Sequence, residues 1–301
     1  MAATTCGTDL KAFVRGHPQI PMPGVFGHEY SGVVEKAGEG SSFKPGDAVM
    51  GVHSAPCQAC YWCTRGQENL CDSIMATKVL GSYAEFLLVP ERIAKLNLFS
   101  KPDHLSFEQA SLLEPLACVA QGVSMLPVQK DSSVLVIGPG AIGLMFVGAL
   151  KIKGVENVVL AGRNETRLAA GASLGAETVK VDQIEKFEGR GFDYVVECTG
   201  QVSVWESSVD YARRGASVLL FGGPPGGTRA SFDTHRLHYD EITLLSPFHF
   251  GTQAVRTARE WLIDPRLDLS ALLSGDRKLE EGDQVFADLK AGLGIKYVFR
   301  P

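Results

Sequence analysis

The sequence of 301 residues lacks long apolar runs and has no segment dominated by one charge. No stretch of about 18 apolar residues occurs, so no membrane-spanning helix is predicted. The first ten residues, MAATTCGTDL, have neither the basic nor the apolar region of a secretory signal, which favours a cytoplasmic protein. The net charge is −5 and no basic patch stands out, so nucleic acid is not an expected partner.

Cysteine is scarce outside one short segment. The chain has seven cysteines, and four of them fall between residues 57 and 71. An odd number with such clustering is a poor disulfide framework. It is typical of metal ligands in a reducing compartment.

The first third of the chain is rich in Gly and Pro, with short β-branched runs. Strands are expected at 31–36 and 48–52, separated by a turn at 43–47. A helix should begin near residue 105, because Ser106 and Gln109 have the spacing of a capping box, and it should continue through residues 114–123.

From residue 132 the pattern changes to strands that alternate with helices. Apolar runs predict strands at 134–137, 158–160, 179–181, 194–196 and 217–221, and helices are expected at 142–153 and 165–174. This alternation predicts an α/β fold with a doubly wound parallel sheet. After residue 254 we expect one helix, at 254–262, and polar linkers.

The cysteine cluster predicts a closed metal site. Three cysteines follow one another at intervals of three residues and the fourth comes soon after: Cys57, Cys60, Cys63 and Cys71. Four thiolates at this spacing can surround one zinc ion tetrahedrally in a structural site. An iron–sulfur cluster would accept the same four ligands.

A second, open metal site is indicated by scattered residues. Cys6 supplies a thiolate and His28 an imidazole. A catalytic zinc needs three protein ligands and one open position. Either Glu29 or Glu114 could be the third ligand.

A glycine-rich turn predicts a dinucleotide site. The strand at 134–137 is followed by G-x-G-x-x-G, which consists of Gly138, Pro139, Gly140, Ala141, Ile142 and Gly143. A helix follows directly, so its N-terminus should face the cofactor pyrophosphate. Two later strand ends, which include Thr199 and Phe221, should line the same site.

The second strand of this domain bears on the choice of cofactor. NAD-binding proteins usually have an acidic residue at its end, where this chain has Gly162. Arg163 and Asn164 follow, and Arg167 comes one turn later. Because Arg can bind a 2′-phosphate, NADP is favoured over NAD. Alternatively, Arg163 is a solvated loop charge and NAD is used with less selectivity between the two cofactors.

One longer motif connects these fragments. Gly27-His28-Glu29-x2-Gly32-x5-Gly38-x2-Ser41 matches the signature of zinc-containing alcohol dehydrogenases. The chain thus resembles the zinc-dependent medium-chain alcohol and polyol dehydrogenases. The resemblance implies a GroES-like catalytic domain at 1–117, a Rossmann domain at 118–253 and a return to the catalytic domain at 254–301. It also implies an active site in the cleft between the domains.

The resemblance also implies roles for single residues. Cys6 and His28 would bind catalytic zinc, and Glu114 would mark the sorbitol and threonine dehydrogenase branch. Thr8 would begin a proton relay, and Asp9 would orient His28. Lys11 stands where relatives often have His. The implied reaction oxidises a secondary alcohol of a polyol or sugar-like substrate with NADP or NAD, or alternatively an amino alcohol such as threonine.

Other implications concern the assembly and the start of the chain. Relatives form homodimers or homotetramers, so a homo-oligomer is expected. Relatives also carry a few dozen residues before the cysteine that matches Cys6, so the first strands of the catalytic domain are expected to be missing here. That favours, as an alternative, a non-catalytic nucleotide-binding protein. A zinc-free quinone reductase is a weaker alternative because it would lack the cysteine cluster.

Overall fold

The computed structural model describes residues 1–18, 20–187 and 191–300, which form two compact units. The first unit comprises Met1–Cys118, His249–Pro265 and Ser270–Pro301, and the second comprises Val119–Phe248 and Arg266–Leu269. The chain therefore returns to the first unit at His249, slightly earlier than the expected residue 254. No helix in the described ranges is long and apolar enough to cross a membrane.

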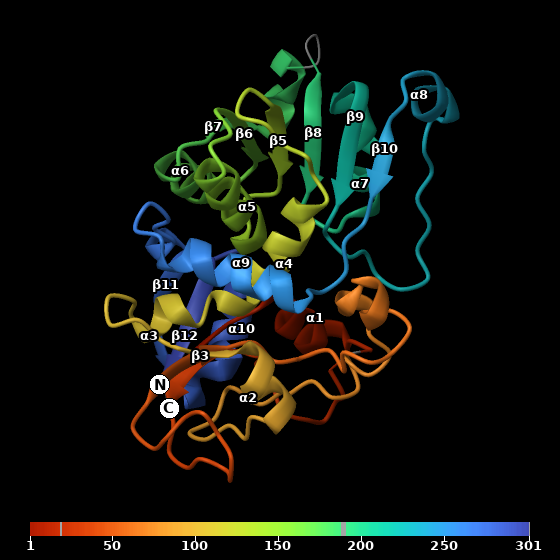
Figure 1. The fold of residues 1–301 in the computed structure, drawn as a ribbon. Helices are drawn as coiled ribbons and strands as arrows, with labels where there is room; N and C mark the ends of the chain where they lie inside the picture. Colours follow the sequence, from red (N-terminus) through yellow and green to blue (C-terminus); the bar gives the residue numbers. More distant parts are fainter. Residues whose placement is uncertain (19, 188–190, 301) are drawn as a thin grey trace. The chain divides into compact units, whose positions relative to one another are not determined.

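The second unit is built around a parallel sheet. Its strands within the described residues are β5 (Ser133–Ile137), β6 (Asn157–Gly162), β7 (Glu177–Lys180), β8 (Phe192–Glu197), β9 (Ala212–Leu220) and β10 (Thr243–Leu245). Their order across the sheet is β7-β6-β5-β8-β9-β10 (Figure 1). In doubly wound sheets, ligands bind beyond the carboxyl ends of the strands where the order reverses, here between β5 and β8. The predicted α/β fold class is confirmed.

Helices cover this sheet and close its core. They are α4 (Leu113–Ser124), which contains the boundary between the units, α5 (Ala141–Ile152), α6 (Glu165–Ser173), α7 (Val202–Ser207) and α8 (Thr234–Tyr239), with 3-10 turns η3 (Val181–Phe187) and η4 (Ser208–Tyr211). Val134, Leu135 and Val136 of β5 are fully buried. A continuous apolar run suits this strand because both faces of a parallel sheet are covered.

The first unit contains a mixed sheet formed by distant parts of the chain. Its strands are β1 (Ala2–Thr4), β2 (Glu29–Val33), β3 (Ala48–Gly51), β4 (Leu98–Ser100), β11 (Leu273–Lys278) and β12 (Lys296–Arg300), in the order β11-β12-β1-β2-β3-β4. β1 is antiparallel to both β12 and β2. The first and last strands are therefore neighbours. β2 begins two residues before the predicted strand, and its first residue is Glu29.

Short helices and turns complete the first unit. They are α1 (Gly7–Arg15), α2 (Glu91–Asn97), α3 (Phe107–Ala110), α9 (Thr252–Ile263) and α10 (Gly282–Lys290), with turns η1 (Cys63–Arg65), η2 (Glu68–Leu70), η5 (Ser270–Leu272) and η6 (Leu279–Glu281). Phe13 of α1 stacks on Phe286 of α10, with ring centroids 4.9 Å apart. Val285 of α10 forms a buried cluster with Tyr297 and Phe299 of β12.

The helix expected to run unbroken from residue 106 is interrupted, so that prediction was wrong. The capping box of Ser106 and Gln109 is present, but α3 ends at Ala110 and α4 begins at Leu113. Pro115 explains the break. It has no N–H to donate to the carbonyl of Ser111, and its ring would clash with that carbonyl in a continuous helix.

The expectation of polar linkers after residue 262 was also wrong. The segment contains β11, α10 and β12. The strand β12 reads Lys-Tyr-Val-Phe-Arg, and a charged residue at each end conceals its strand character. Lys296 is buried, and its Nζ pairs with the carboxylate of Glu29.

Candidate functional site

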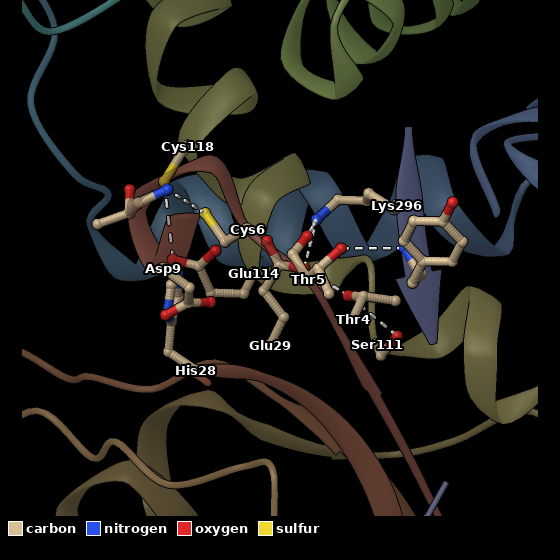
Figure 2. A network of polar contacts seen from close by, with 12 residues as sticks. Thr4, Thr5, Cys6, Asp9, His28, Glu29, Ser111, Glu114, Cys118 and Lys296 are labelled. Atoms are coloured by element: carbon tan, nitrogen blue, oxygen red, sulfur yellow. Dashed lines mark hydrogen bonds and ion pairs between the residues drawn. The ribbon is translucent and has the colours of Figure 1, made fainter. Parts of the chain in front are cut away.

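Three potential metal ligands gather at the start of α1 and β2. Atoms of Cys6, His28 and Glu29 all lie within 4.8 Å of one another. Cys6 is the N-cap residue of α1, and its Sγ accepts a hydrogen bond from the backbone N–H of Thr8 (3.4 Å). Thiolate, imidazole and carboxylate are ligand types that zinc accepts. Figure 2 shows these side chains converging from two different elements.

The carboxylate of Asp9 lies beside the ring of His28. The Oδ1 atom of Asp9 lies 3.3 Å from Nδ1 of His28, and Tyr83 donates its hydroxyl proton to Oδ2 of Asp9 (2.8 Å). Burial acts to raise the pKa of Asp9, but the charge of the neighbouring His28 and the hydrogen bond from Tyr83 lower it overall. Because Nδ1 faces Asp9, Nε2 of His28 is left to bind a metal.

The two carboxylate oxygens of Glu29 have different surroundings. Oε2 accepts hydrogen bonds from the hydroxyl of Thr4 and from Nζ of Lys296. Oε1 is buried and has no hydrogen-bond partner among the described residues. A buried carboxylate oxygen without a partner is costly. Oε1 therefore fits a metal ion that would complete its bonding.

Glu114, the alternative third ligand, is engaged elsewhere. Its Oε1 lies 3.2 Å from Nδ1 of His53 and 3.9 Å from the thiol of Cys118. Glu114 does not belong to the set of mutually close ligand atoms formed by Cys6, His28 and Glu29. The geometry thus favours Glu29, with Glu114 beside the cluster.

Two further histidines lie here that sequence reasoning did not identify. The ring centroid of His53 is 5.1 Å from that of His28 and 5.3 Å from that of His249. Nε2 of His249 is 2.6 Å from the hydroxyl of Ser54. Burial and the neighbouring charge of His28 hold the pKa of His53 well below its ordinary value. No spacing motif marks these histidines, and His249 reaches the cluster only because the chain returns to this unit.

The four clustered cysteines come together as predicted from their spacing. Sulfur atoms of Cys57, Cys60, Cys63 and Cys71 lie within 4.8 Å of one another, and all four are free thiols. Backbone N–H groups of Cys57 and Cys60 donate to Sγ of Cys71 and Cys57, each at 3.3 Å. Burial acts to raise the pKa of Cys71, yet hydrogen bonds from the backbone N–H of Cys57 and from Ser73 lower it to about 6. A thiolate at Cys71 suits a closed metal site.

The glycine-rich turn of the second unit has the steric features of a pyrophosphate cradle. A Cβ at Gly143 would lie 2.0 Å from the carbonyl oxygen of Gly138, so α5 can pack this closely only with glycine there. A Cβ at Gly140 would meet no atom within 4 Å. Gly140 is also the N-cap residue of α5, where a helix presents unpaired N–H groups. The open space therefore fits an anionic group.

The end of β6 is shaped by Pro139. A Cβ at Gly162 would lie 2.3 Å from the ring of Pro139, which leaves no room for an acidic side chain. Arg163 is exposed. Asn164 caps α6, since its side-chain oxygen accepts from the N–H of Arg167 (3.0 Å). The Asn164 side chain thus has a structural role in addition to the cofactor contact predicted for it.

At the ends of β8 and β9 the polar groups bind one another. Oε1 of buried Glu197, which sequence reasoning did not single out as a site residue, accepts hydrogen bonds from the N–H of Thr199 (2.6 Å) and from its hydroxyl. The ring of Phe221 packs edge-on against Phe146, with centroids 5.0 Å apart. These contacts shape the loop beside the glycine-rich turn.

Comparison with known proteins agrees with this geometry. A family model described as the alcohol dehydrogenase GroES-like domain matches residues 1–99, and one described as zinc-binding dehydrogenase matches residues 141–264. L-threonine 3-dehydrogenase of Chromobacterium violaceum is 30% identical over 97% of this chain and 88% of its own length. D-arabinitol dehydrogenase 1 of Uromyces fabae is 29% identical over 98% of this chain and 87% of its own.

A solved structure shows the same fold. A zinc-binding dehydrogenase of Sinorhizobium meliloti bound to NADP is 28% identical, with a TM-score of 0.89 over 100% of this chain and 90% of its own. The shared architecture, the extent of the sequence matches and the paired family models lead to one assignment. The chain belongs to the zinc-dependent medium-chain alcohol and polyol dehydrogenase family.

Proposed function

We propose that this chain oxidises a secondary alcohol of a polyol or sugar-like molecule, with NADP as the oxidant and with zinc bound by Cys6, His28 and Glu29. The observation that carries the proposal is that half-buried Cys6 and buried His28 and Glu29 lie close together, with Oε1 of Glu29 lacking a protein partner among the described residues. Similarity to D-arabinitol dehydrogenase and to the sorbitol dehydrogenase of Halalkalibacterium halodurans supports a polyol substrate.

We assign a separate role in the reaction to each group of the proposed site. Zinc, when bound, acts as a Lewis acid that favours ionisation of the substrate hydroxyl. Overall, the alcohol loses a proton and a hydride, becomes a ketone and converts NADP⁺ to NADPH. Asp9 keeps the His28 ring in position, and Lys296 holds one oxygen of Glu29.

We propose that the proton leaves along α1. Thr8 is half-buried beside Cys6, in the first turn of this helix. Lys11 lies three residues later, on the same face of the helix. A proton taken by the Thr8 hydroxyl would pass towards Lys11 and the solvent.

The preference for NADP is proposed from the end of β6. The close approach of Gly162 to Pro139 excludes the carboxylate that would repel a 2′-phosphate, and exposed Arg163 can pair with that phosphate. The NADP-bound relative from Sinorhizobium meliloti supports this choice. Substitution Arg163→Ala should raise the Kd for NADP at least tenfold and leave that for NAD nearly unchanged, measured by calorimetric titration. Equal effects on both cofactors would contradict the preference.

The cysteine cluster is proposed to hold a second, structural zinc. Its four sulfur ligands leave no open position for substrate. Elemental analysis of the purified chain should therefore give two zinc ions per chain. The same protein should reduce NADP when it is assayed with a panel of polyols. One zinc ion and no turnover, with NADP still bound, would instead support a non-catalytic nucleotide-binding protein.

Oxidation of an amino alcohol is the second candidate reaction. The similarity to L-threonine 3-dehydrogenase favours it. Including L-threonine in the same panel decides the question, because a kcat/KM for threonine above that for every polyol would overturn the polyol assignment.

We also propose a cytoplasmic homodimer or homotetramer, by analogy with the family. Light scattering on the purified chain gives the number of subunits, and a monomer would contradict the proposal.

A further inference from the structure

The last strand of the first unit places a charged side chain beside the candidate metal ligand Glu29. Lys296 begins β12 and has only 2% of its surface exposed. Its Nζ lies 2.5 Å from Oε2 of Glu29, which is completely buried, and 2.6 Å from the carbonyl oxygen of Thr5. Figure 2 shows Glu29 between His28 and Lys296.

A buried pair of this kind is weak evidence for a role in stability. Removing an ammonium and a carboxylate from water costs several kcal/mol for each ion. Well-packed apolar side chains in place of a buried ion pair often give a protein that is equally stable or more stable. The pair is also asymmetric. Both donors, Lys296 and Thr4, bind Oε2, and Oε1 has none among the described residues.

We propose that Lys296 is a positioning residue that makes Glu29 bind the metal through a single oxygen. By holding Oε2, the ammonium turns Oε1 towards Cys6 and His28 and prevents the carboxylate from binding through both oxygens. A second carboxylate oxygen would otherwise occupy the coordination position that the substrate needs. The inference rests on the function proposed above.

The alternative is that Lys296 only attaches β12 to β1. A matched control separates the two. Thr5 also joins these strands, because its hydroxyl oxygen accepts a hydrogen bond from the N–H of Tyr297 (2.9 Å), but the two side-chain donors to Glu29 are Thr4 and Lys296. Thr5→Val therefore weakens the strand pairing and keeps the hydrogen bonds that Thr4 and Lys296 donate to Glu29.

The test is the visible spectrum of the cobalt-substituted protein. Tetrahedral cobalt absorbs more strongly than five-coordinate cobalt, and the four-cysteine site contributes equally to every variant. Lys296→Met should weaken the absorption of the Cys6 site and lower kcat by about 10- to 100-fold, the usual effect of removing a group that holds a metal ligand. Lys296→Arg should restore part of both, and Thr5→Val should match the wild type.

The outcomes distinguish this inference from the proposed function. A folded Lys296→Met protein with the wild-type spectrum and kcat overturns the positioning role. If Lys296→Met does not fold, Thr4→Val removes the other donor to Oε2 and should shift the spectrum in the same direction, and an unchanged spectrum would again overturn the role. A wild-type chain that binds metal only at the cysteine cluster would instead overturn the proposed function itself.

Discussion

At the scale of single residues, the candidate metal site contains charged side chains in a buried environment, which disfavours the charged state. Asp9, Glu29 and Lys296 are each almost completely buried, and each has an oppositely charged or hydrogen-bonding partner. Burial acts to lower the pKa of Lys296, but the charge of Glu29 raises it overall, so the ammonium persists. Removing one partner should therefore affect the site more than the loss of a single hydrogen bond.

The first prediction concerns the orientation of His28. Asp9→Asn replaces the acceptor facing Nδ1 of His28 by an amide that can present a donor, so the imidazole should lose its orientation. We expect kcat/KM to fall about 10- to 100-fold in steady-state assays. Tyr83→Phe is the control, because it removes a hydrogen bond from the opposite oxygen and keeps the carboxylate. An equal loss in both variants would contradict the orienting role.

The second prediction concerns acid sensitivity caused by His53. Folded His53 remains neutral because its pKa is depressed, whereas the unfolded residue takes up a proton below about pH 6.5. The unfolded chain then binds more protons, so the free energy of unfolding should fall as the pH decreases, by up to about 1.4 kcal/mol per pH unit. His53→Asn should show a shallower decrease between pH 6.5 and 5 in urea unfolding. An unchanged slope would argue against a neutral His53.

Not every residue of the site could be found from the sequence. Cys6, His28 and Glu29 occur in local motifs, which made them visible. Lys296 lies 267 residues after Glu29. A lysine at the end of a strand is usually solvent-exposed. Only strand pairing brings it to a carboxylate, and no local pattern encodes that pairing.

At the scale of elements, the turn between β5 and α5 combines close packing with an open space. Gly143 permits the close packing and Gly140 borders the open space. The third prediction separates them. Gly143→Ala should lower Tm by several degrees because its Cβ meets backbone, whereas Gly140→Ala should keep Tm and weaken NADP binding. Thermal unfolding and calorimetric titration of both variants test this, and loss of stability in Gly140→Ala would count against it.

Elements with strong local signals were predicted better than those defined by distant contacts. The strands β5, β6 and β8 are apolar runs, and their positions were predicted to within two residues. The break before α4 is not visible in the apolar pattern, because it comes from the effect of Pro115 on the carbonyl of Ser111. β12 escaped because its ends are charged and its partner, β1, lies at the other end of the chain.

At the scale of the whole molecule, the two units have separate cores and contain different candidate sites. The candidate metal ligands all belong to the first unit, and the glycine-rich turn belongs to the second. The fourth prediction is that calorimetry resolves two transitions. A chelator should lower one of them, and NADP should raise the other. A single transition that responds to both additions would contradict the independence of the units.

The pairing of β12 with β1 also affects how the protein is made. A ribosome synthesises Cys6, His28 and Glu29 early, but Lys296 follows Glu29 only after 267 residues. Until then, nascent Glu29 has no ammonium to hold it, and β1 has only one of its two neighbouring strands. If Lys296 positions Glu29 as proposed, zinc captured during translation would meet an incomplete site, and its final coordination would form only once β12 has paired with β1.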